Sequence, residues 1–496
     1  MRRGGMVVMA VVIAAAGCTS DPAPGQGSSA PATQAIERAA VALGGTDRLR
    51  ALKSLIMEGD GTQRNVGQDL TPDATGQTFV ISEYRRVLSF SADAARTELT
   101  RTPAFPYFQG PSARRQIMGV DGSVGYNISP LGVSIRVSDL ATRQRRDEML
   151  HHPIAIIRAA LEPGTTLSNV RTQGAETLID VGTPAGASFT VGLDGSTSLP
   201  LHVRSPSEDP NLGDVVLETA FDDYRDAGGI KVPFRVVTKT DRWTTSELVF
   251  TTVDVDGFSG DMAAPADAAA SRPAAAVPAP VVDDQEIAPG AWLMAGQSHH
   301  SVLVELQDEL LLVEAPQSEA RTRAVIARAR ELRSGKPVTR LVNTHHHFDH
   351  SAGLRAAVAE RLTVVTHEGN ADFVREMIRR PHRRTPDILA RQPQPLTLVS
   401  VGDRLELGDR SRAVQALHVA GSPHSATMLM VYLPRERLLV EADAFTPNAP
   451  APFAAHLLDE IGRRHLAVDR IVPLHGSIVP FDALRTAVRQ AIATPD

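Results

Sequence analysis

The stretch RLVNTHHHFDHSAGL, residues 340–354, decides how this chain is interpreted. It begins with a short apolar run typical of a buried strand, and residues 351–360 have the pattern of a helix. Four metal-binding side chains lie on the loop between these elements: His345, His347, Asp349 and His350. A loop at the end of a buried strand is a place where a rigid scaffold presents functional groups. The spacing therefore predicts a metal site rather than a histidine run on the surface.

Composition indicates a soluble protein with more than one domain. The chain has 496 residues, of which 42% are hydrophobic and 22% are charged, as in globular proteins. This length predicts two or three domains. A formal net charge of -6 argues against a general nucleic-acid-binding surface, so we expect no nucleic-acid partner.

The N-terminus has the pattern of a targeting segment. Two arginines precede an apolar run, residues 6–16, that is too short to span a bilayer but suits a secretory signal. The small residues before Cys18 resemble the lipobox of bacterial lipoproteins, which implies a signal peptide over residues 1–17 and a lipid anchor on Cys18. A plain signal peptide is the alternative.

These features predict an exported, periplasmic protein that is anchored to a membrane of a bacterial envelope. Residues 18–32 are rich in Pro, Gly, Ser and Ala and are expected to form a flexible tether. Because Cys18 is the only cysteine, we expect no disulfide and no thiolate metal ligand in the chain.

A second change in composition divides the chain. Residues 259–283 are dominated by Ala and Pro, and such a stretch is expected to bury too little apolar surface to order itself. We interpret it as a linker between an N-terminal domain, residues 33–258, and a C-terminal domain, residues 284–496.

The N-terminal domain is expected to consist mostly of antiparallel strands after an opening pair of helices. Helical patterns cover residues 35–43 and 47–55. Apolar and polar residues alternate over 230–236, which predicts a half-buried strand, and residues 189–203 have the pattern of a hairpin.

This half resembles the curved antiparallel sheet of periplasmic lipoprotein-carrier proteins, and the resemblance implies a surface that holds acyl chains. His151 and His152 also lie here, without ligand spacing around them. We interpret that pair as ordinary surface residues.

The C-terminal domain contains a faint internal repeat. The sequence LLVE occurs at residues 311–314 and at 438–441, and each copy is followed by a second apolar strand with a histidine at its end. Two similar α/β halves facing each other would bring both strand ends to one rim of a two-sheet sandwich. Chance similarity of two apolar strands is the alternative.

Three further polar residues lie next to predicted strands: His424, Asp443 and His475. Each one alone is more often structural than a ligand. Together with the histidine loop, however, they resemble the ligand pattern of the metallo-β-lactamase superfamily over the whole of residues 284–496. The resemblance implies an αββα sandwich with a dinuclear metal site. The fold class expected for the chain is therefore α+β, with this sandwich behind an N-terminal, predominantly antiparallel β domain that contains helices.

Carried over by position, the resemblance assigns seven ligands. The first metal would be bound by His345, His347 and His424. The second metal would be bound by Asp349, His350 and His475, with Asp443 bridging the two.

One position departs from the family pattern. Glu314, followed by Ala315 and Pro316, stands where the family commonly has Asp-Thr-Gly. That Asp usually supports the ligand loop, so we expect Glu314 to reach the loop with its longer side chain.

The ligand chemistry indicates a hydrolase. Imidazole and carboxylate without thiolate favour Zn²⁺, two per chain, and are also compatible with Fe or Mn. Two cations lower the pKa of bound water to about 7, so a metal-bound hydroxide would attack the substrate at neutral pH. Asp349 is expected to be catalytic, orienting the hydroxide and relaying its proton.

Export narrows the substrate. Glutathione thioesters and structured RNA are cytoplasmic, so the predicted substrate is a small molecule with an ester, lactone or amide bond, and β-lactam hydrolysis stays open. His299 and His300 lie in a turn where loops of the resembled family often face the cleft; we interpret them as exposed loop residues, with a role at the cleft as the alternative. Residues 373–378 form an apolar stripe, interpreted as core, and the arginines of 379–384 are interpreted as a solvated face. The alternative for those arginines is a lid that holds a substrate carboxylate.

A second function from another class stays open. The N-terminal half would then bind an acyl chain or another hydrophobic ligand in the periplasm, and the metal domain would be non-catalytic. The complete ligand set favours the enzyme, a dinuclear zinc metallo-hydrolase.

Overall fold

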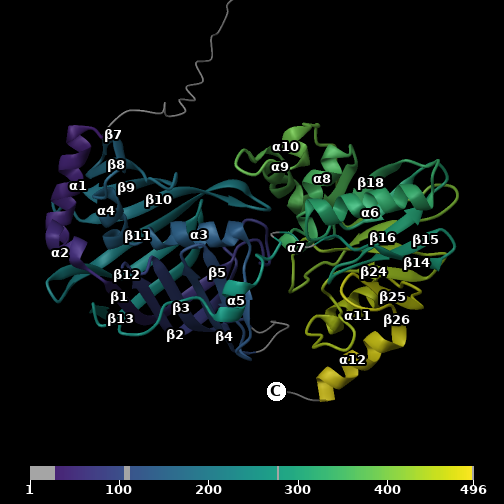
Figure 1. The fold of residues 1–496 in the computed structure, drawn as a ribbon. Helices are drawn as coiled ribbons and strands as arrows, with labels where there is room; N and C mark the ends of the chain where they lie inside the picture. Colours follow the sequence, from purple (N-terminus) through teal and green to yellow (C-terminus); the bar gives the residue numbers. More distant parts are fainter. Residues whose placement is uncertain (1–27, 106–111, 276, 278, 494–496) are drawn as a thin grey trace, which may run out of the picture.

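The computed structural model describes residues 28–105, 112–275, 277 and 279–493. The predicted signal peptide and Cys18 lie outside these residues. One large sheet forms the N-terminal part, and two smaller sheets lie beside it in the C-terminal part (Figure 1). Within the described ranges, no helix has the length and apolar character needed to cross a membrane.

The N-terminal sheet has 13 strands in the order β6-β5-β4-β3-β2-β1-β13-β12-β11-β10-β9-β8-β7, and all neighbours are antiparallel. Its strands are β1 (Ser54–Asn65), β2 (Gln77–Ser89), β3 (Ala94–Pro103), β4 (Arg114–Asp121), β5 (Val124–Ile128), β6 (Ser134–Arg136), β7 (Thr166–Gln173), β8 (Glu176–Gly182), β9 (Ser188–Asp194), β10 (Pro200–Asp209), β11 (Gly213–Ala227), β12 (Ile230–Thr240) and β13 (Trp243–Val255). The predicted antiparallel domain is confirmed, and so are the β9–β10 hairpin and the strand that begins at Ile230.

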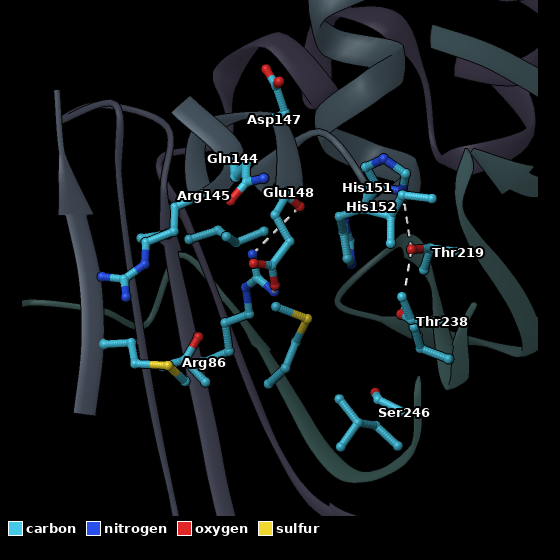
Figure 2. Close-up of a pocket in the computed structure, with 18 of the residues that line it drawn as sticks. Arg86, Gln144, Arg145, Asp147, Glu148, His151, His152, Thr219, Thr238 and Ser246 are labelled. Atoms are coloured by element: carbon cyan, nitrogen blue, oxygen red, sulfur yellow. Dashed lines mark hydrogen bonds and ion pairs between the residues drawn. The ribbon is translucent and has the colours of Figure 1, made fainter. Parts of the chain in front are cut away.

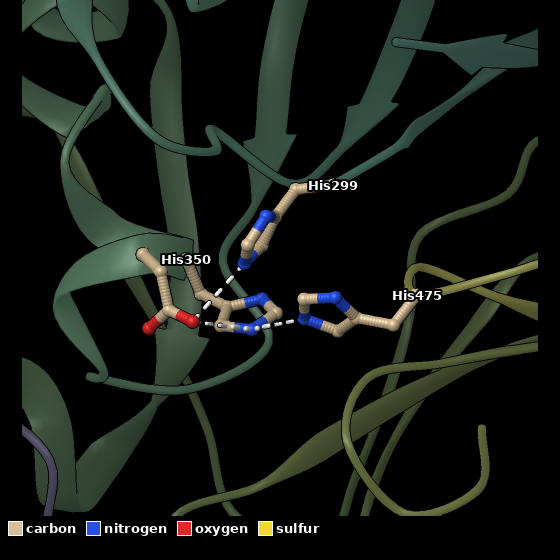
Figure 3. Close-up of side chains that lie close together, drawn as sticks. His299, His350 and His475 are labelled. Carbon is tan, nitrogen blue, oxygen red and sulfur yellow. Dashed lines mark hydrogen bonds and ion pairs between the residues drawn. The ribbon is translucent and has the colours of Figure 1, made fainter. Parts of the chain in front are cut away.

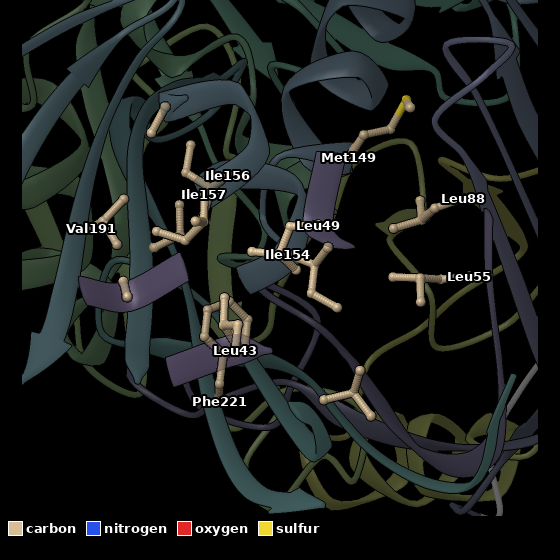
Figure 4. Close-up of a cluster of buried hydrophobic side chains, with 14 of the residues drawn as sticks. Leu43, Leu49, Leu55, Leu88, Met149, Ile154, Ile156, Ile157, Val191 and Phe221 are labelled. Atoms are coloured by element: carbon tan, nitrogen blue, oxygen red, sulfur yellow. The ribbon is translucent and has the colours of Figure 1, made fainter. Parts of the chain in front are cut away.

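Helices pack on part of this sheet, and the main hydrophobic core of the domain lies between these helices and the strands. They are α1 (Ala30–Leu43), α2 (Thr46–Ala51), α3 (Asp139–Met149), α4 (Pro153–Ala160) and α5 (Ala266–Ala270). Ile154, Ile156 and Ile157 of α4 are fully buried with Leu43 and Leu49 of the first two helices (Figure 4). Each such side chain contributes about 1.5–3 kcal/mol by leaving water.

The second predicted helix is shorter than expected. It ends at Ala51, because the backbone N–H groups of Lys53 and Ser54 donate to Asp256 and Ser54 already pairs with Ser89 in the sheet. Pairing with two strands overrides the local helical pattern at these residues.

The stretch 259–283 is mostly exposed, and two of its residues are buried. Met262 is 5% exposed and packs with Val87 and Ala94, and Ala268 is 0% exposed where α5 contacts β5 and β6. The interpretation of His151 and His152 as surface residues is wrong. His151 and His152 are 6% and 7% exposed and therefore do not lie on the surface. Their burial depends on strands far away in the chain, which local spacing does not reveal.

The C-terminal part contains two sheets with helices outside each. The first has the order β14-β15-β16-β17-β18-β19-β20 and the second β21-β22-β23-β24-β25-β26. Their strands are β14 (Asp283–Ala288), β15 (Ala291–Ala295), β16 (Ser301–Glu305), β17 (Leu310–Val313), β18 (Val338–Val342), β19 (Thr363–His367), β20 (Leu398–Val401), β21 (Arg404–Glu406), β22 (Gln415–His418), β23 (Leu429–Leu433), β24 (Leu438–Glu441), β25 (Arg470–Pro473) and β26 (Val479–Pro480). The helices are α6 (Glu319–Leu332), α7 (Phe348–Ser351), α8 (Leu354–Ala359), the 3₁₀ turn η1 (Glu368–Asn370), α9 (Ala371–Arg379), α10 (Ile388–Arg391), α11 (Ala454–Arg463) and α12 (Phe481–Ala493).

Strand β17 illustrates why these elements stack as four layers. Leu311 and Val313 pack between the two sheets, whereas Leu310 and Leu312 face the layer that contains α6 and α8. Because successive side chains of a strand point to opposite faces, a strand that is apolar at every position is buried on both faces. A third cluster lies between the second sheet and α11 and α12, so the predicted αββα sandwich is confirmed.

The predicted repeat is also present in this sandwich. Strand β17 pairs with β18 in parallel through α6, and β24 pairs with β25 in parallel through α11. Parallel strands end at the same edge of a sheet, and the four carboxyl ends therefore present their following residues at one rim. Those residues include Glu314, the histidine loop, Asp443 and His475.

Candidate metal centre

The structure gathers the predicted ligands into two neighbouring clusters. Cluster A contains His345, His347, His424 and Asp443. Cluster B contains His299, Asp349, His350 and His475. In each cluster, one ligand atom from every member lies within 4.8 Å of those of the other members. All seven predicted ligands thus lie at one site, and His299 is an eighth member of it.

Asp443 joins the two clusters. Its Oδ2 lies 3.0 Å from His424 Nε2 and 3.1 Å from His350 Nε2, and 3.5 Å from His345 Nε2. Its Oδ1 lies 2.9 Å from His475 Nε2. One carboxylate therefore contacts imidazoles from both clusters, which is the arrangement that a bridging ligand requires.

Two imidazoles of cluster A, His345 and His347, are neutral. Burial, together with the neighbouring His350, lowers the pKa of His345 to about 3. Burial also holds the pKa of His347 well below its ordinary value. A neutral imidazole offers a nitrogen lone pair, which is the form that binds a metal.

In cluster B, the carboxylates around His350 favour a positive charge. Burial acts to lower the pKa of His350, but the carboxylates of Asp443 and Asp349 outweigh burial and raise it well above its ordinary value. For Asp443, burial acts to raise the pKa, and His350 and His424 outweigh it and hold that pKa well below its usual range. A cation between these groups would supply the positive charge that the carboxylates favour.

Unpaired nitrogens provide a direct test of whether these residues fit metal ions. Among the described residues, His347 Nδ1 is buried and has no hydrogen-bond partner. His345 Nε2 and His424 Nε2 are buried beside the Asp443 carboxylate, but neither makes a hydrogen bond of acceptable geometry to it. In cluster B, His475 Nε2 lies 3.1 Å from His350 Nε2, so two ring nitrogens face each other (Figure 3). Buried polar atoms without partners are costly, and a shared cation would satisfy them together. The residues present therefore fit a metal centre.

Comparison with known proteins agrees with this site. Residues 295–494 match the family model described as the metallo-beta-lactamase superfamily. The C-terminal domain belongs to this superfamily. Superfamily membership and the two clusters support a metal-dependent hydrolase in general.

Several solved structures resemble part of the chain. The DIM-1 metallo-beta-lactamase is 16% identical with a TM-score of 0.34, and the match covers 43% of this chain and 98% of that one. The metallo-beta-lactamase from Pontibacter korlensis is 18% identical with a TM-score of 0.34, covering 42% and 98%. The mono-zinc form of FIM-1 from Pseudomonas aeruginosa is 18% identical with a TM-score of 0.33, covering 44% and 97%. These likenesses carry no argument about substrate, and no curated protein matches the chain.

Glu314 contacts the ligand loop, as expected for a Glu that replaces the usual Asp of the family at this position. Its Oε2 lies 3.0 Å from His350 Nδ1 and accepts from the Thr344 hydroxyl, while its Oε1 accepts from Asn343 Nδ2 at 3.2 Å. Glu314 is 1% exposed and has a φ of 81°, in the left-handed region. The longer side chain thus reaches the loop from a strained backbone position.

His299 is the member of the site that sequence spacing did not assign as a ligand. Its Nε2 lies 3.0 Å from Asp349 Oδ2, and its Nδ1 lies 2.8 Å from Ser298 Oγ. The turn between β15 and β16 places it there with 8% exposure, so its interpretation as an exposed loop residue is wrong. The only sequence signal for a role in the site was its position in a turn that often faces the cleft. His300 instead accepts from the Gly296 backbone N–H at 3.3 Å and does not join either cluster.

The loop between β1 and β2, residues 66–76, reaches the metal site from the N-terminal domain. Gln68 Nε2 donates to Asp349 Oδ1 at 2.6 Å, and His347 Nε2 donates to the Asp69 carbonyl at 2.9 Å. Gly67 allows the close approach, because a Cβ there would lie 2.4 Å from the Phe348 ring. The bond to Asp69 leaves His347 Nδ1 as the nitrogen available to a metal.

The resulting cleft has walls from both domains. Its volume is about 310 Å³. It is lined by Asn65, Gln68, Gln77, Phe79 and Phe105 from the N-terminal domain, and by His347, Asp349, His424, Asp443, Thr446, Phe453 and His475 from the C-terminal domain. This volume is within the range of about 300–1,000 Å³ that is usual for small-molecule sites.

The arginine cluster at 379–384 is neither a solvated face throughout nor a free lid. The Arg380 guanidinium donates to the Leu212 and Asp214 carbonyls and pairs with Asp241. The backbone N–H groups of Arg383 and Arg384 donate to the Asp214 carboxylate. The cluster therefore holds the two domains together, which local charge patterning could not indicate. The apolar stripe before it is core as predicted, with Val374 and Met377 buried.

Proposed function

We propose that this protein is an exported hydrolase that uses two Zn²⁺ ions to cleave an ester, lactone or amide bond in a small molecule, β-lactams included. The observation that supports the proposal best is the place of Asp443, whose two carboxylate oxygens lie within 3.5 Å of imidazoles from both clusters. Export and the lipid anchor on Cys18 rest on the sequence pattern of residues 1–18.

The donor set favours zinc. Cluster A offers three imidazoles and one carboxylate, and cluster B offers three imidazoles and one carboxylate besides the shared Asp443. Nitrogen and oxygen donors without sulfur suit Zn²⁺. When bound, a pair of such cations lowers the pKa of water to about 7 and polarises the substrate oxygen.

Asp349 is the residue placed to handle the proton of the attacking water. Burial acts to raise its pKa, but His350 and His299 outweigh burial and hold the pKa below its usual range. The ionised carboxylate is fixed by Gln68 on Oδ1 and by His299 on Oδ2, and its side chain is 37% exposed to the cleft. An acceptor held in this way orients a water molecule and takes its proton.

The test is metal content together with turnover, measured on the chain from residue 28 onward. Elemental analysis and a panel of carboxylic esters, lactones, nitrocefin and a phosphodiester are applied to wild type, to His345→Ala and to His465→Ala. His465 is exposed and outside both clusters, so it is the matched control. We expect about two metal ions per chain, loss of turnover with a chelator, recovery with Zn²⁺, and loss of turnover in His345→Ala alone.

The competing function makes the opposite prediction. A periplasmic ligand-binding protein with a non-catalytic metal domain would bind fewer than one metal ion, and His345→Ala would behave like wild type. That result would remove the hydrolase proposal.

A further inference from the structure

A second cavity lies in the N-terminal domain, between the sheet and helix α3. Its volume is about 360 Å³, which is also within the usual range for small-molecule sites. Figure 2 shows the polar side chains that enter it from α3, the following turn and the sheet. None of these residues belongs to the metal clusters.

Most of the wall is apolar. Met57, Tyr84, Leu88, Leu99 and Phe250 line it from the central strands of the sheet. Their apolar atoms give a buried occupant no hydrogen-bond partners, so an apolar occupant is favoured along this wall.

The charges in the cavity cancel. Arg86 pairs with Glu148 at 2.7 Å, and Arg145 and Asp147 contribute one further charge of each sign. Burial lowers the pKa of His151 to about 4, so this imidazole is neutral at pH 7. An uncharged group therefore suits the cavity better than a free carboxylate.

Two polar atoms in the cavity wall lack partners. His152 is 7% exposed, and its Nδ1 has no hydrogen-bond partner among the described residues. The same holds for the buried Nε of Arg86. By contrast, both ring nitrogens of His151 are satisfied, by Thr219 at 3.0 Å and Ser205 at 2.8 Å. Unsatisfied polar atoms in the wall of a largely apolar cavity are typical of a ligand site.

This cavity and the metal cleft adjoin each other on the same strands. Gln63 of β1 lines the cavity, whereas Phe79, its direct partner on β2, lines the metal cleft. Directly opposed residues have Cβ atoms about 5 Å apart. Asn65, two positions after Gln63, also lines the metal cleft. The linings of the two spaces thus meet at neighbouring residues of β1 and β2.

Long side chains occupy the junction of the two linings. Arg101, two positions after Leu99 of the cavity wall, lies over the Phe79 ring at 3.5 Å from its centroid and donates to Asn65 Oδ1. An unbranched chain displaces such side chains less than a rigid ring system would, so it is the moiety best able to occupy both spaces.

We propose that the N-terminal cavity is the acyl-chain compartment of the metal site, so that the substrate is an ester or amide with a long, unbranched apolar chain. This inference rests on the proposed hydrolase function for the reacting end of the substrate. The chain would lie along Met57, Leu88 and Leu99, and its carbonyl would lie in the cleft lined by Asp349 and Asp443. The N-terminal domain would then select substrates by chain length.

Two adjacent residues of β13 provide a matched test. Leu248 is 8% exposed and lines the cavity, whereas Val249 is 50% exposed on the other face of the sheet. Leu248→Trp fills the cavity and Val249→Trp adds the same side chain outside it. Thermal unfolding identifies any variant that fails to fold. If Leu248→Trp does not fold, Ala95→Met, which enlarges another residue of the cavity wall, replaces it.

The first measurement is binding without metal. Displacement of N-phenylnaphthylamine by 1-decanol is followed on the chelator-treated chain from residue 28 onward. We expect displacement in wild type and Val249→Trp, and at least a tenfold weaker affinity in Leu248→Trp. Equal decanol binding by both variants, or no binding by wild type, would overturn the compartment even if short esters are cleaved.

The second measurement is kcat/KM for p-nitrophenyl acetate, hexanoate and decanoate. Each buried methylene is expected to raise kcat/KM by up to about fourfold. Leu248→Trp should remove this rise and leave the acetate value within about twofold of wild type, while Val249→Trp changes neither. A series that is flat in wild type would overturn the inference. Decanol binding without turnover of any ester would refute the hydrolase proposal alone and leave the cavity as a binding site.

Discussion

Replacing Glu314 by Asp is expected to weaken metal binding, although Asp is the residue that the family pattern favours here. Removing one methylene shortens the side chain by about 1.5 Å. With the backbone in place, the 3.0 Å separation between Glu314 Oε2 and His350 Nδ1 would grow to about 4.5 Å, beyond hydrogen-bond range. Among the described residues, Glu314 is the one hydrogen-bond partner of His350 Nδ1, so the ring would lose the contact that orients it.

The size of the effect follows from that contact. Losing a buried hydrogen bond to a charged acceptor costs about 1.5–3 kcal/mol. Loss of a group that orients a metal-binding histidine typically lowers metal affinity by about 10–100-fold. A φ of 81° is better tolerated by Asp than by Glu. This difference stabilises the folded Glu314→Asp variant by less than about 1 kcal/mol, which offsets only part of the lost hydrogen bond. Metal affinity is therefore the sharper measurement.

The assay is zinc affinity by competition with a fluorescent chelator, with urea unfolding of the metal-free protein beside it. Glu331→Asp is the control, because Glu331 is 65% exposed and pairs only with Arg328 among the described residues. We expect Glu314→Asp to lose at least tenfold in affinity and the control to lose none. If Glu314→Asp binds zinc within about threefold of wild type, the argument from side-chain reach is wrong.

Three further outcomes are expected. His299→Ala should lower metal content toward one ion per chain by elemental analysis, and retention of two ions would exclude His299 as a ligand. Gln68→Ala should lower kcat about tenfold with unchanged metal content, because Asp349 loses one of its two fixed contacts; an unchanged kcat would separate the loop from catalysis. Burial, reinforced by Arg86, lowers the folded pKa of His152 to about 3, whereas the unfolded value is about 6.5. The unfolded chain therefore binds the proton more tightly, and stability from this group is present above pH 6.5 and is lost as pH falls toward 3. His152→Asn should reduce the loss of urea stability between pH 6.5 and 5 by up to about 1.4 kcal/mol per pH unit, and an unchanged slope would contradict the burial argument.

The sandwich and most of the site could be predicted from sequence because their signals are local. Strand β17 is apolar at every position, and β18, β24 and β25 have buried apolar residues near their carboxyl ends, with polar residues just beyond. His345, Asp443 and His475 all stand directly beyond such strands, so the topology of parallel pairs is enough to bring them to one rim. Motif spacing and the positions of the strand ends thus predict the same location for the metal ligands.

The rest could not be predicted because it depends on contacts between distant segments. His151 is buried by Ser205 and Thr219, which lie on strands β10 and β11, and nothing beside His151 in sequence indicates that. The role of Arg380 depends on Asp241, 139 positions away. Charge and periodicity report the local environment, whereas these residues acquire theirs only when distant segments meet, within the N-terminal domain for His151 and between the two domains for Arg380.

The contact between the domains also bears on why they are fused. A domain that served only as a spacer or a separate carrier would not need to touch the ligands of its neighbour. Here Gln68 lies 2.6 Å from the carboxylate of Asp349, and the Asp69 carbonyl accepts from His347. These bonds orient one residue in each cluster from the opposite domain, so the isolated C-terminal domain would lack part of what shapes its own metal site. The two domains are better regarded as one catalytic unit, in which the sandwich holds the ligands and the large sheet fixes their orientation and one wall of the cleft.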